Sequence, residues 1–178
     1  MPWIKTLSRK RFDFLNPDPA SICIEDIACA LSNICRFTGH LETMYSVAQH
    51  SVLVSELVPV ELALEALLHD GSEAYCNDIS SPLKTLLPEY REIEGRIQTA
   101  INHRFGIYTP KNPLIKRADL IMLSTEMRDL GEYDEDETPD PVLYPPASFI
   151  IKPVDSFTAR KIFIDKFHEL KKMVSVSE

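Results

Sequence analysis

The adjacent pair His69-Asp70, which follows the apolar residues Leu67-Leu68, is the feature that most restricts the fold of this chain. A histidine beside an aspartate at the end of an apolar helix is typical of a metal site, and such a site needs further ligands. Two other segments offer them: His50 lies before this pair and Asp119 lies well after it. The chain must therefore fold so that three separate segments meet at these four side chains.

Helical periodicity places the candidate ligands toward the interior. His50 shares one helix face with four apolar residues at offsets of three, four and seven, namely Val47, Leu53, Val54 and Leu57. Asp119 shares a face in the same way with Ile115, Met122 and Leu123. An ionised carboxylate among hydrocarbon is very costly unless it is paired or coordinates a cation. The pattern favours a metal site formed by His50, His69, Asp70 and Asp119.

Glu73 is the acid nearest to these candidate ligands. It follows His69 by four residues and Asp70 by three, so on a continuous helix it would lie on the same face, roughly 5–6 Å away between Cβ atoms. From there it could act on an attacking water molecule without being a ligand itself.

Each of these residues also has an ordinary explanation. A histidine on an apolar helix face is often a hydrogen-bonded core residue, and the dipeptide His-Asp can simply place charge at a helix end. Asp119 could pair with a neighbouring Lys or Arg, and Glu73 could be a solvated acid. The occurrence of all of them together, in this order, favours the metal site.

The rest of the sequence indicates an all-α fold, with an extended arm or a short β-hairpin in residues 1–21. Apolar periodicity and capping signals predict helices over 24–34, around His50, over 60–70, from Ser81-Pro82, and over 88–105, 113–130 and 156–173. Residues 131–148 are acidic and rich in proline, which indicates a loop. We expect a single domain over residues 1–178.

Composition restricts the partners and the location of the chain. Its 178 residues are 44% hydrophobic, which is enough for a substantial core, and its net charge of −8 opposes a long nucleic acid as partner. The four cysteines lack zinc-knuckle spacing and are expected to be free thiols. Because the sequence has neither a signal-like leader nor an apolar run of membrane-spanning length, we expect a cytoplasmic protein that has no membrane partner.

The order of His50, His69-Asp70 and Asp119 resembles that of the HD superfamily of metal-dependent phosphohydrolases. Further stretches are similar to its YfdR-type group, which is close to the 5′-deoxynucleotidases: Cys35 to His40, Tyr45 to Ser51, Glu73-Ala74-Tyr75, Asp78-Ile79, Pro82-Leu83-Lys84 and Ala118 to Leu123. The similarity covers about residues 3–131, and Gly71 stands where the family usually has alanine. The resemblance implies that the all-α fold is an HD-domain helical bundle.

The resemblance also implies roles for individual residues. Glu73 corresponds to a glutamate that acts as general base or orients the attacking water. Arg36 corresponds to a phosphate-binding arginine, and Lys84 is a second candidate for phosphate contact. Asp78 resembles an aspartate that binds the sugar 3′-hydroxyl, and Phe37 stands where the relatives carry a tryptophan that crowds a ribose 2′-hydroxyl. Taken singly, Arg36, Asp78 and Lys84 could also be ordinary surface or loop residues.

The expected function is the hydrolysis of a 2′-deoxynucleoside monophosphate to deoxynucleoside and phosphate, with a dNTP triphosphohydrolase as the alternative. The same site could serve another phosphorylated small molecule such as an alarmone, and a non-catalytic nucleotide-binding module is a third class. Histidine and carboxylate ligands suit one divalent Mn, Co, Zn, Fe or Ni ion better than Mg or Ca. The expected partners are a deoxynucleotide substrate and, as the relatives imply, further copies of the chain in a homo-oligomer.

Overall fold

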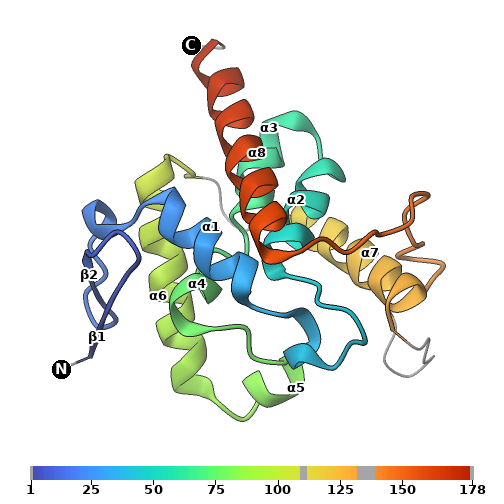
Figure 1. The fold of residues 1–178 in the computed structure, drawn as a ribbon, viewed down its shortest axis with the longest axis horizontal. Helices are drawn as coiled ribbons and strands as arrows, with labels where there is room; N and C mark the ends of the chain where they lie inside the picture. Colours follow the sequence, from blue (N-terminus) through green and yellow to red (C-terminus); the bar gives the residue numbers. More distant parts are fainter. Residues whose placement is uncertain (1, 109–111, 132–138, 177–178) are drawn as a thin grey trace.

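The computed structural model describes residues 2–108, 112–131 and 139–176, and it is mostly helical. A two-stranded antiparallel hairpin opens the chain, with β1 at Trp3–Lys5 and β2 at Arg11–Asp13. The predicted all-α fold with a hairpin at the N-terminal end is therefore confirmed (Figure 1).

Helices make up most of the remaining described chain. In order they are η1 at Pro19–Ser21, α1 at Ile24–Asn33, η2 at Arg36–Gly39, α2 at Val47–Glu56, α3 at Val60–Leu67, α4 at Glu73–Cys76, α5 at Ser81–Lys84, α6 at Pro88–Phe105, α7 at Pro113–Asp129 and α8 at Ser156–Val176. Local signals set several of these ends. Gly106 stops α6 in a left-handed conformation with φ 75°, and the Asn112 side chain caps α7 by accepting from Leu114 N at 2.9 Å.

The predicted end of the helix over 60–70 is wrong, because α3 stops at Leu67. His69 and Asp70 instead lie in a tight turn, in which Gly71 N donates to Leu68 O at 3.0 Å and Glu73 N donates to Asp70 O at 3.0 Å. The His69 side chain supplies the physical reason. Its Nδ1 lies 2.7 Å from Ala66 O, the carbonyl that a continued α-helix would pair with Asp70 N.

The predicted loop over 131–148 is described only in part, since residues 132–138 lie outside the described residues. Residues 139–148 contain turns and no helix or strand. The last helix begins at Ser156 as predicted and continues to Val176, three residues beyond the predicted end at Met173.

Two hydrophobic clusters hold α2 in place. Helix α8 packs on α1, α2 and α3, and it crosses the middle of the molecule in Figure 1. The larger cluster includes its buried residues Ala159, Phe163, Phe167 and Leu170. The smaller cluster lies between α2 and α7 and consists of Tyr45, Val54, Ala66, Ile115, Ala118, Met122 and Ile151. Helix α2, which carries His50, is thus packed against α8 and α7 at once.

The segment 147–154, which leads to α8, is hydrogen-bonded to the helices beneath it. Arg128 on α7 donates to the carbonyls of Ala147 and Phe149 at 2.7 and 2.6 Å, and its neighbour Asp129 accepts from Ile151 N at 2.8 Å. Gln49 on α2 bonds to two backbone groups of the same segment, at 2.8 and 3.0 Å. The segment therefore fastens α7 and α2 to each other from outside.

The hairpin supports the short helix α4. The ring of Phe12 on β2 stacks on Tyr75 of α4, with 3.9 Å between centroids and 19° between planes. All four cysteines are free thiols, as predicted. Among the described helices, none has the length and apolar character that crossing a membrane requires.

Candidate metal centre

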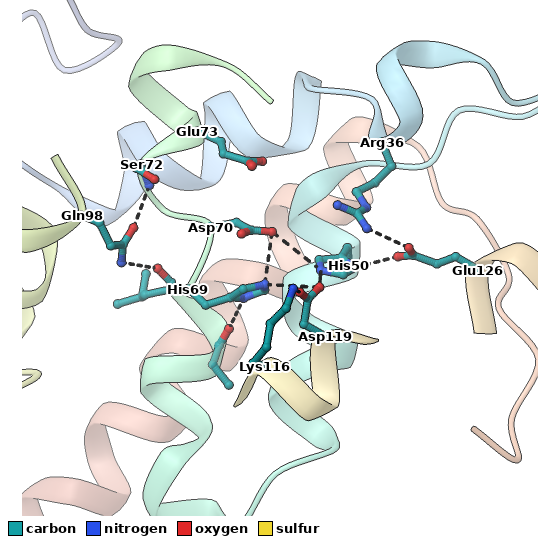
Figure 2. Close-up of polar contacts among 12 residues, drawn as sticks. Arg36, His50, His69, Asp70, Ser72, Glu73, Gln98, Lys116, Asp119 and Glu126 are labelled. Carbon is teal, nitrogen blue, oxygen red and sulfur yellow. Dashed lines mark hydrogen bonds and ion pairs between the residues drawn. The ribbon is translucent and has the colours of Figure 1, made fainter. Parts of the chain in front are cut away.

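Three of the predicted ligands form one compact group in the structure (Figure 2). His50 comes from α2 and is fully buried, His69 comes from the turn after α3, and Asp119 comes from α7. Asp119 Oδ1 lies 3.4 Å from His50 Nε2 and 3.9 Å from His69 Nε2. One ligand atom from each residue lies within 4.8 Å of the others, so this group could hold a metal ion.

Asp70 lies against the same two imidazoles. Its Oδ2 is 3.2 Å from His69 Nε2 and 3.7 Å from His50 Nε2. In Figure 2 the carboxylates of Asp70 and Asp119 approach the histidine rings from opposite directions. The four side chains that the sequence singled out are thus brought together from three separate parts of the chain.

Hydrogen bonds on the far side of each ring determine which nitrogen can bind a cation. Nδ1 of His69 lies 2.7 Å from Ala66 O, and Nδ1 of His50 lies 2.6 Å from Glu126 Oε1. A carbonyl or a carboxylate can only accept, so both Nδ1 atoms carry the proton. Both Nε2 atoms are buried and have no hydrogen-bond partner in the described part of the chain. Once deprotonated, each Nε2 directs its lone pair at the group formed with Asp119.

The charges of the cluster support one another. Burial and Arg36 lower the pKa of His50, but Glu126 and Asp119 outweigh them and raise it to about 9. Burial favours the neutral forms of Asp70 and Asp119, yet the two histidines hold the pKa of both carboxyls well below the usual range. The carboxylates are therefore ionised at neutral pH, and the imidazoles would release a proton when a cation binds.

Glu73, the predicted general base, is the first residue of α4 and lies next to the cluster. Its side chain is only 5% exposed. Its Oε1 lies 3.4 Å from Lys84 Nζ, whereas Oε2 is buried and lacks a hydrogen-bond partner among the described residues. Burial raises the pKa of Glu73 to about 10, and the charges of Asp70 and Asp78 add to the effect. A buried acid with one such oxygen is suited to exchange a proton with a bound molecule.

Arg36, the predicted phosphate ligand, is held in place by a partner that the sequence did not reveal. Its Nη2 donates to Glu126 Oε2 at 2.9 Å, and its Nε is buried without a partner in the described ranges. The ring of Phe37 lies against the guanidinium, 5.4 Å from its Cζ. Phe37 and Thr38 both adopt left-handed backbone conformations, with φ 54° and 55°. Each costs roughly 1–2 kcal/mol, and strain of this kind is concentrated at ligand sites.

Asp78 and Lys84 lie close to Glu73 but are already engaged. Burial raises the pKa of Asp78 and outweighs the opposing positive charges of Arg36 and Lys84. Lys84 Nζ is 2.7 Å from Glu94 Oε1 on α6, nearer than it is to Glu73. Lys84 therefore links α5 to α6, and its charge is shared between two acids.

Glu126 is the site residue that sequence analysis missed. It is fully buried on α7 and contacts both His50 and Arg36. It follows Asp119 by seven residues, which is two helical turns, so it lies on the same face of α7. That offset could have revealed Glu126 in the sequence. A second acid on the buried helix face of Asp119 needs a partner just as Asp119 does.

A cleft of about 710 Å³ opens beside the cluster. His69, Asp70 and Asp119 are among the residues that line it, together with Gln98 and Asn102 of α6. A volume of this size is sufficient for a nucleotide. These three candidate ligands are therefore accessible to a small molecule, whereas His50 is fully buried behind them.

Comparison with known proteins places the chain in a family. No family model matches it. It is 46% identical over 174 residues to the uncharacterized protein YfdR of Escherichia coli (strain K12), covering 97% of this chain and 98% of YfdR. This chain belongs to the YfdR family. An uncharacterized protein of Rhodobacter capsulatus is 33% identical over 193 residues, with 97% of each chain covered. Similarity within the YfdR family thus extends well beyond residue 131, where the resemblance seen in the sequence stopped.

In this YfdR-family chain, a residue of α6 holds the turn that carries His69 and Asp70. Gln98 Nε2 donates to Leu68 O at 2.8 Å, and Gln98 Oε1 accepts from Ser72 N at 3.1 Å. Gln98→Leu would leave Ser72 N without its acceptor, at a cost of about 1–3 kcal/mol, and Leu68 O would keep only its bond from Gly71 N. We expect urea denaturation to show a loss of unfolding free energy of that order, together with weaker Mn²⁺ binding by the loosened turn.

Thr99→Ala is the matched control for Gln98→Leu. Among the described residues, Thr99 Oγ1 bonds within its own helix, to Gly95 O at 2.8 Å. Thr99→Ala should therefore leave Mn²⁺ binding unchanged. If Gln98→Leu also bound Mn²⁺ as the parent does, the turn would not depend on this contact.

Proposed function

We propose that this YfdR-family protein is a metal-dependent phosphohydrolase that removes the 5′-phosphate from a 2′-deoxynucleoside monophosphate. One observation carries the proposal. Two buried Nε2 atoms without hydrogen-bond partners among the described residues converge with the carboxylates of Asp70 and Asp119, and the buried acid Glu73 lies next to them. This combination of groups suits hydrolysis assisted by a cation, and it opens onto a cleft of nucleotide size.

The residues present fit a single divalent transition-metal ion. After releasing a proton, His50 and His69 offer imidazole nitrogens, while Asp119 and Asp70 offer ionised oxygens, a set that suits Mn, Co, Zn, Fe or Ni. Such an ion, when bound, supplies Lewis-acid activation of water and of the phosphate ester. The chain's own contribution is to fix both histidine tautomers and to keep the carboxylates ionised.

Glu73 would take the proton of the attacking water. Its Oε2 has no hydrogen-bond partner in the described chain, which leaves this oxygen available for the task. Burial and nearby acids favour its neutral form, and a neighbouring divalent cation would lower its pKa toward the working range of a general base.

Arg36 would hold the phosphate. Its buried Nε has no acceptor within the described residues, and an anionic ligand would supply one. Phe37 lies over the guanidinium and Asp78 lies beside Glu73. In the proposal these two residues contact the sugar, Phe37 at the 2′ position and Asp78 at the 3′-hydroxyl.

The charges of the cleft favour a monophosphate over a triphosphate. Its described lining carries three cations and four carboxylates, namely Lys84, Arg91, Lys116, Glu65, Asp70, Glu94 and Asp119. A divalent ion would bring this balance to one net positive charge, which matches a phosphate monoester better than a triphosphate. A dNTP triphosphohydrolase is the second candidate, because Lys116 Nζ, 2.8 Å from Asp119 Oδ2, would be released for further phosphates once Asp119 bound a cation.

A product assay tests the proposal. Chelator-treated protein is given Mn, Co, Zn, Fe or Ni one at a time, with deoxynucleoside mono- and triphosphates, their ribose counterparts, an alarmone and a cyclic nucleotide as substrates. We expect metal-dependent release of inorganic phosphate from the monophosphates. Tripolyphosphate from a dNTP would establish the second candidate instead. Hydrolysis restricted to an alarmone or a cyclic nucleotide, or none with any metal, would refute the proposal.

A further inference from the structure

We infer that Glu126 is a positioning residue that couples the metal site to the anion site, an inference that rests on the proposed function. The single carboxylate of Glu126 joins a residue from each site. Its Oε1 lies 2.6 Å from His50 Nδ1, and its Oε2 accepts from Arg36 Nη2 at 2.9 Å (Figure 2). All three side chains come from different helices, α7, α2 and η2.

The bond to His50 determines what the metal site can bind. Because Glu126 accepts the Nδ1 proton, Nε2 is the nitrogen of His50 that can give up its proton and bind a cation, and it faces Asp119 Oδ1 at 3.4 Å. The opposite tautomer would put a proton on Nε2 and exclude a cation. Outer hydrogen-bond partners of this kind orient metal-binding histidines in proteins generally.

The bond to Arg36 determines what the anion site presents. A guanidinium is planar, so fixing Nη2 restricts the direction of its other donors. Nε then stays buried and lacks an acceptor among the residues described. The Arg36 side chain is 14% exposed and Glu126 is 0% exposed, so water competes little for the pair.

These two bonds make each site depend on the other through Glu126. Any shift of its carboxylate toward one partner changes its bond to the other. Coupling of this kind is reciprocal, so a cation at His50 and an anion at Arg36 should change each other's affinity by the same factor.

The substitution Glu126→Gln separates the two bonds. A carboxylate accepts at both oxygens, whereas an amide accepts at one end and donates at the other. The amide of this variant would therefore satisfy either the His50 proton or the Arg36 donor, but not both. The loss of an outer partner of a metal ligand typically costs about 10–100-fold in metal affinity.

The experiment measures two affinities by calorimetry, for Mn²⁺ alone and for inorganic phosphate at a Mn²⁺ concentration that saturates each variant. We expect Glu126→Gln to retain one affinity near the parent value and to lose about 10–100-fold in the other. Glu126→Ala, if it folds, should lose both. Asp129→Asn is the matched control, because Asp129 is an acid on the same helix whose side chain is only 4% exposed and bonds to Arg128 and Ile151 N instead. It should retain both affinities.

Two results would overturn the inference. One is a folded Glu126→Gln protein that binds Mn²⁺ and phosphate as the parent does. The other is a parent protein that binds neither ligand. If only the proposed function were wrong, the parent would bind Mn²⁺ and phosphate but would hydrolyse no nucleotide. The binding data for the variants would still decide the role of Glu126.

Discussion

Glu73→Gln should lower kcat for phosphate release by about 10²–10⁴-fold, the usual loss when a general acid or base is removed. Its affinity for Mn²⁺ should stay at the parent value, because Glu73 lies next to the ligand cluster and outside the group that binds the ion. Initial rates at saturating Mn²⁺ and substrate measure the first effect, and a calorimetric Mn²⁺ titration measures the second.

Glu94→Gln provides the control for Glu73→Gln, because Glu94 shares its lysine partner. Lys84 Nζ lies 2.7 Å from Glu94 and 3.4 Å from Glu73. If Glu73 only positioned Lys84, both variants would lose activity to a similar degree. We expect a much smaller loss for Glu94→Gln, since it removes no proton acceptor from the cluster.

The pH dependence of thermal stability provides a second test of the role of Glu73. Burial raises its pKa from the ordinary 4.5 to about 10 in the metal-free folded protein. A raised acid pKa means that its proton stabilises the folded state fully below pH 4.5 and that this contribution is lost as the pH rises toward 10. Glutamine stays neutral throughout. Glu73→Gln should therefore gain thermal stability relative to the parent between about pH 5 and 9, whereas equal stability across that range would contradict a buried, protonated Glu73.

Asp119→Asn should lose more Mn²⁺ affinity than the roughly 10–100-fold that is typical when a hydrogen-bond partner of a metal ligand is removed. All measurable hydrolysis should be lost with it. Asp119 belongs to the group of three ligand atoms that lie within 4.8 Å of one another. The parent should be stabilised by about 2.7 kcal/mol at an Mn²⁺ concentration about 100 times the dissociation constant, and the variant should lose this gain. Thermal denaturation with and without Mn²⁺ measures the difference.

The same measurement on Asp70→Asn tests whether Asp70, the fourth candidate ligand, also binds the ion. We expect a comparable loss, because Asp70 Oδ2 contacts both imidazoles, at 3.2 and 3.7 Å. His168→Ala, at an exposed position on α8, should behave as the parent does. Unchanged Mn²⁺ binding in Asp119→Asn would show that the cluster is not the metal site.

Local signals are sufficient to predict the long helices and the convergence of the ligands. Helix α6 runs from Pro88 to Phe105 as predicted, because proline and Gly106 mark its ends within the sequence itself. The apolar helix face that carries His50 predicts its burial, and His50 is fully buried. Periodicity is thus reliable where burial alone decides the position of a side chain.

Features that depend on distant partners could not be predicted. The early end of α3 results from the His69 side chain and from Gln98, which lies 26 residues beyond Ser72. Nothing near His69 in the sequence indicates that partner. The same holds for Glu126, which is 90 residues from Arg36. Periodicity can place such a residue on a buried face, but only the packed structure shows what it contacts.

The hydrogen bonds of segment 147–154 have a consequence for how the chain can be divided. They attach α7 through Arg128 and Asp129, and α2 through Gln49, the neighbour of His50. A fragment that ended before this segment would keep every candidate ligand, but it would lose the attachment of two of the helices that carry them. We therefore expect segment 147–154, and α8 that follows it on α1, α2 and α3, to unfold together with the ligand cluster. We expect the smallest autonomous version of this protein to include its last helix.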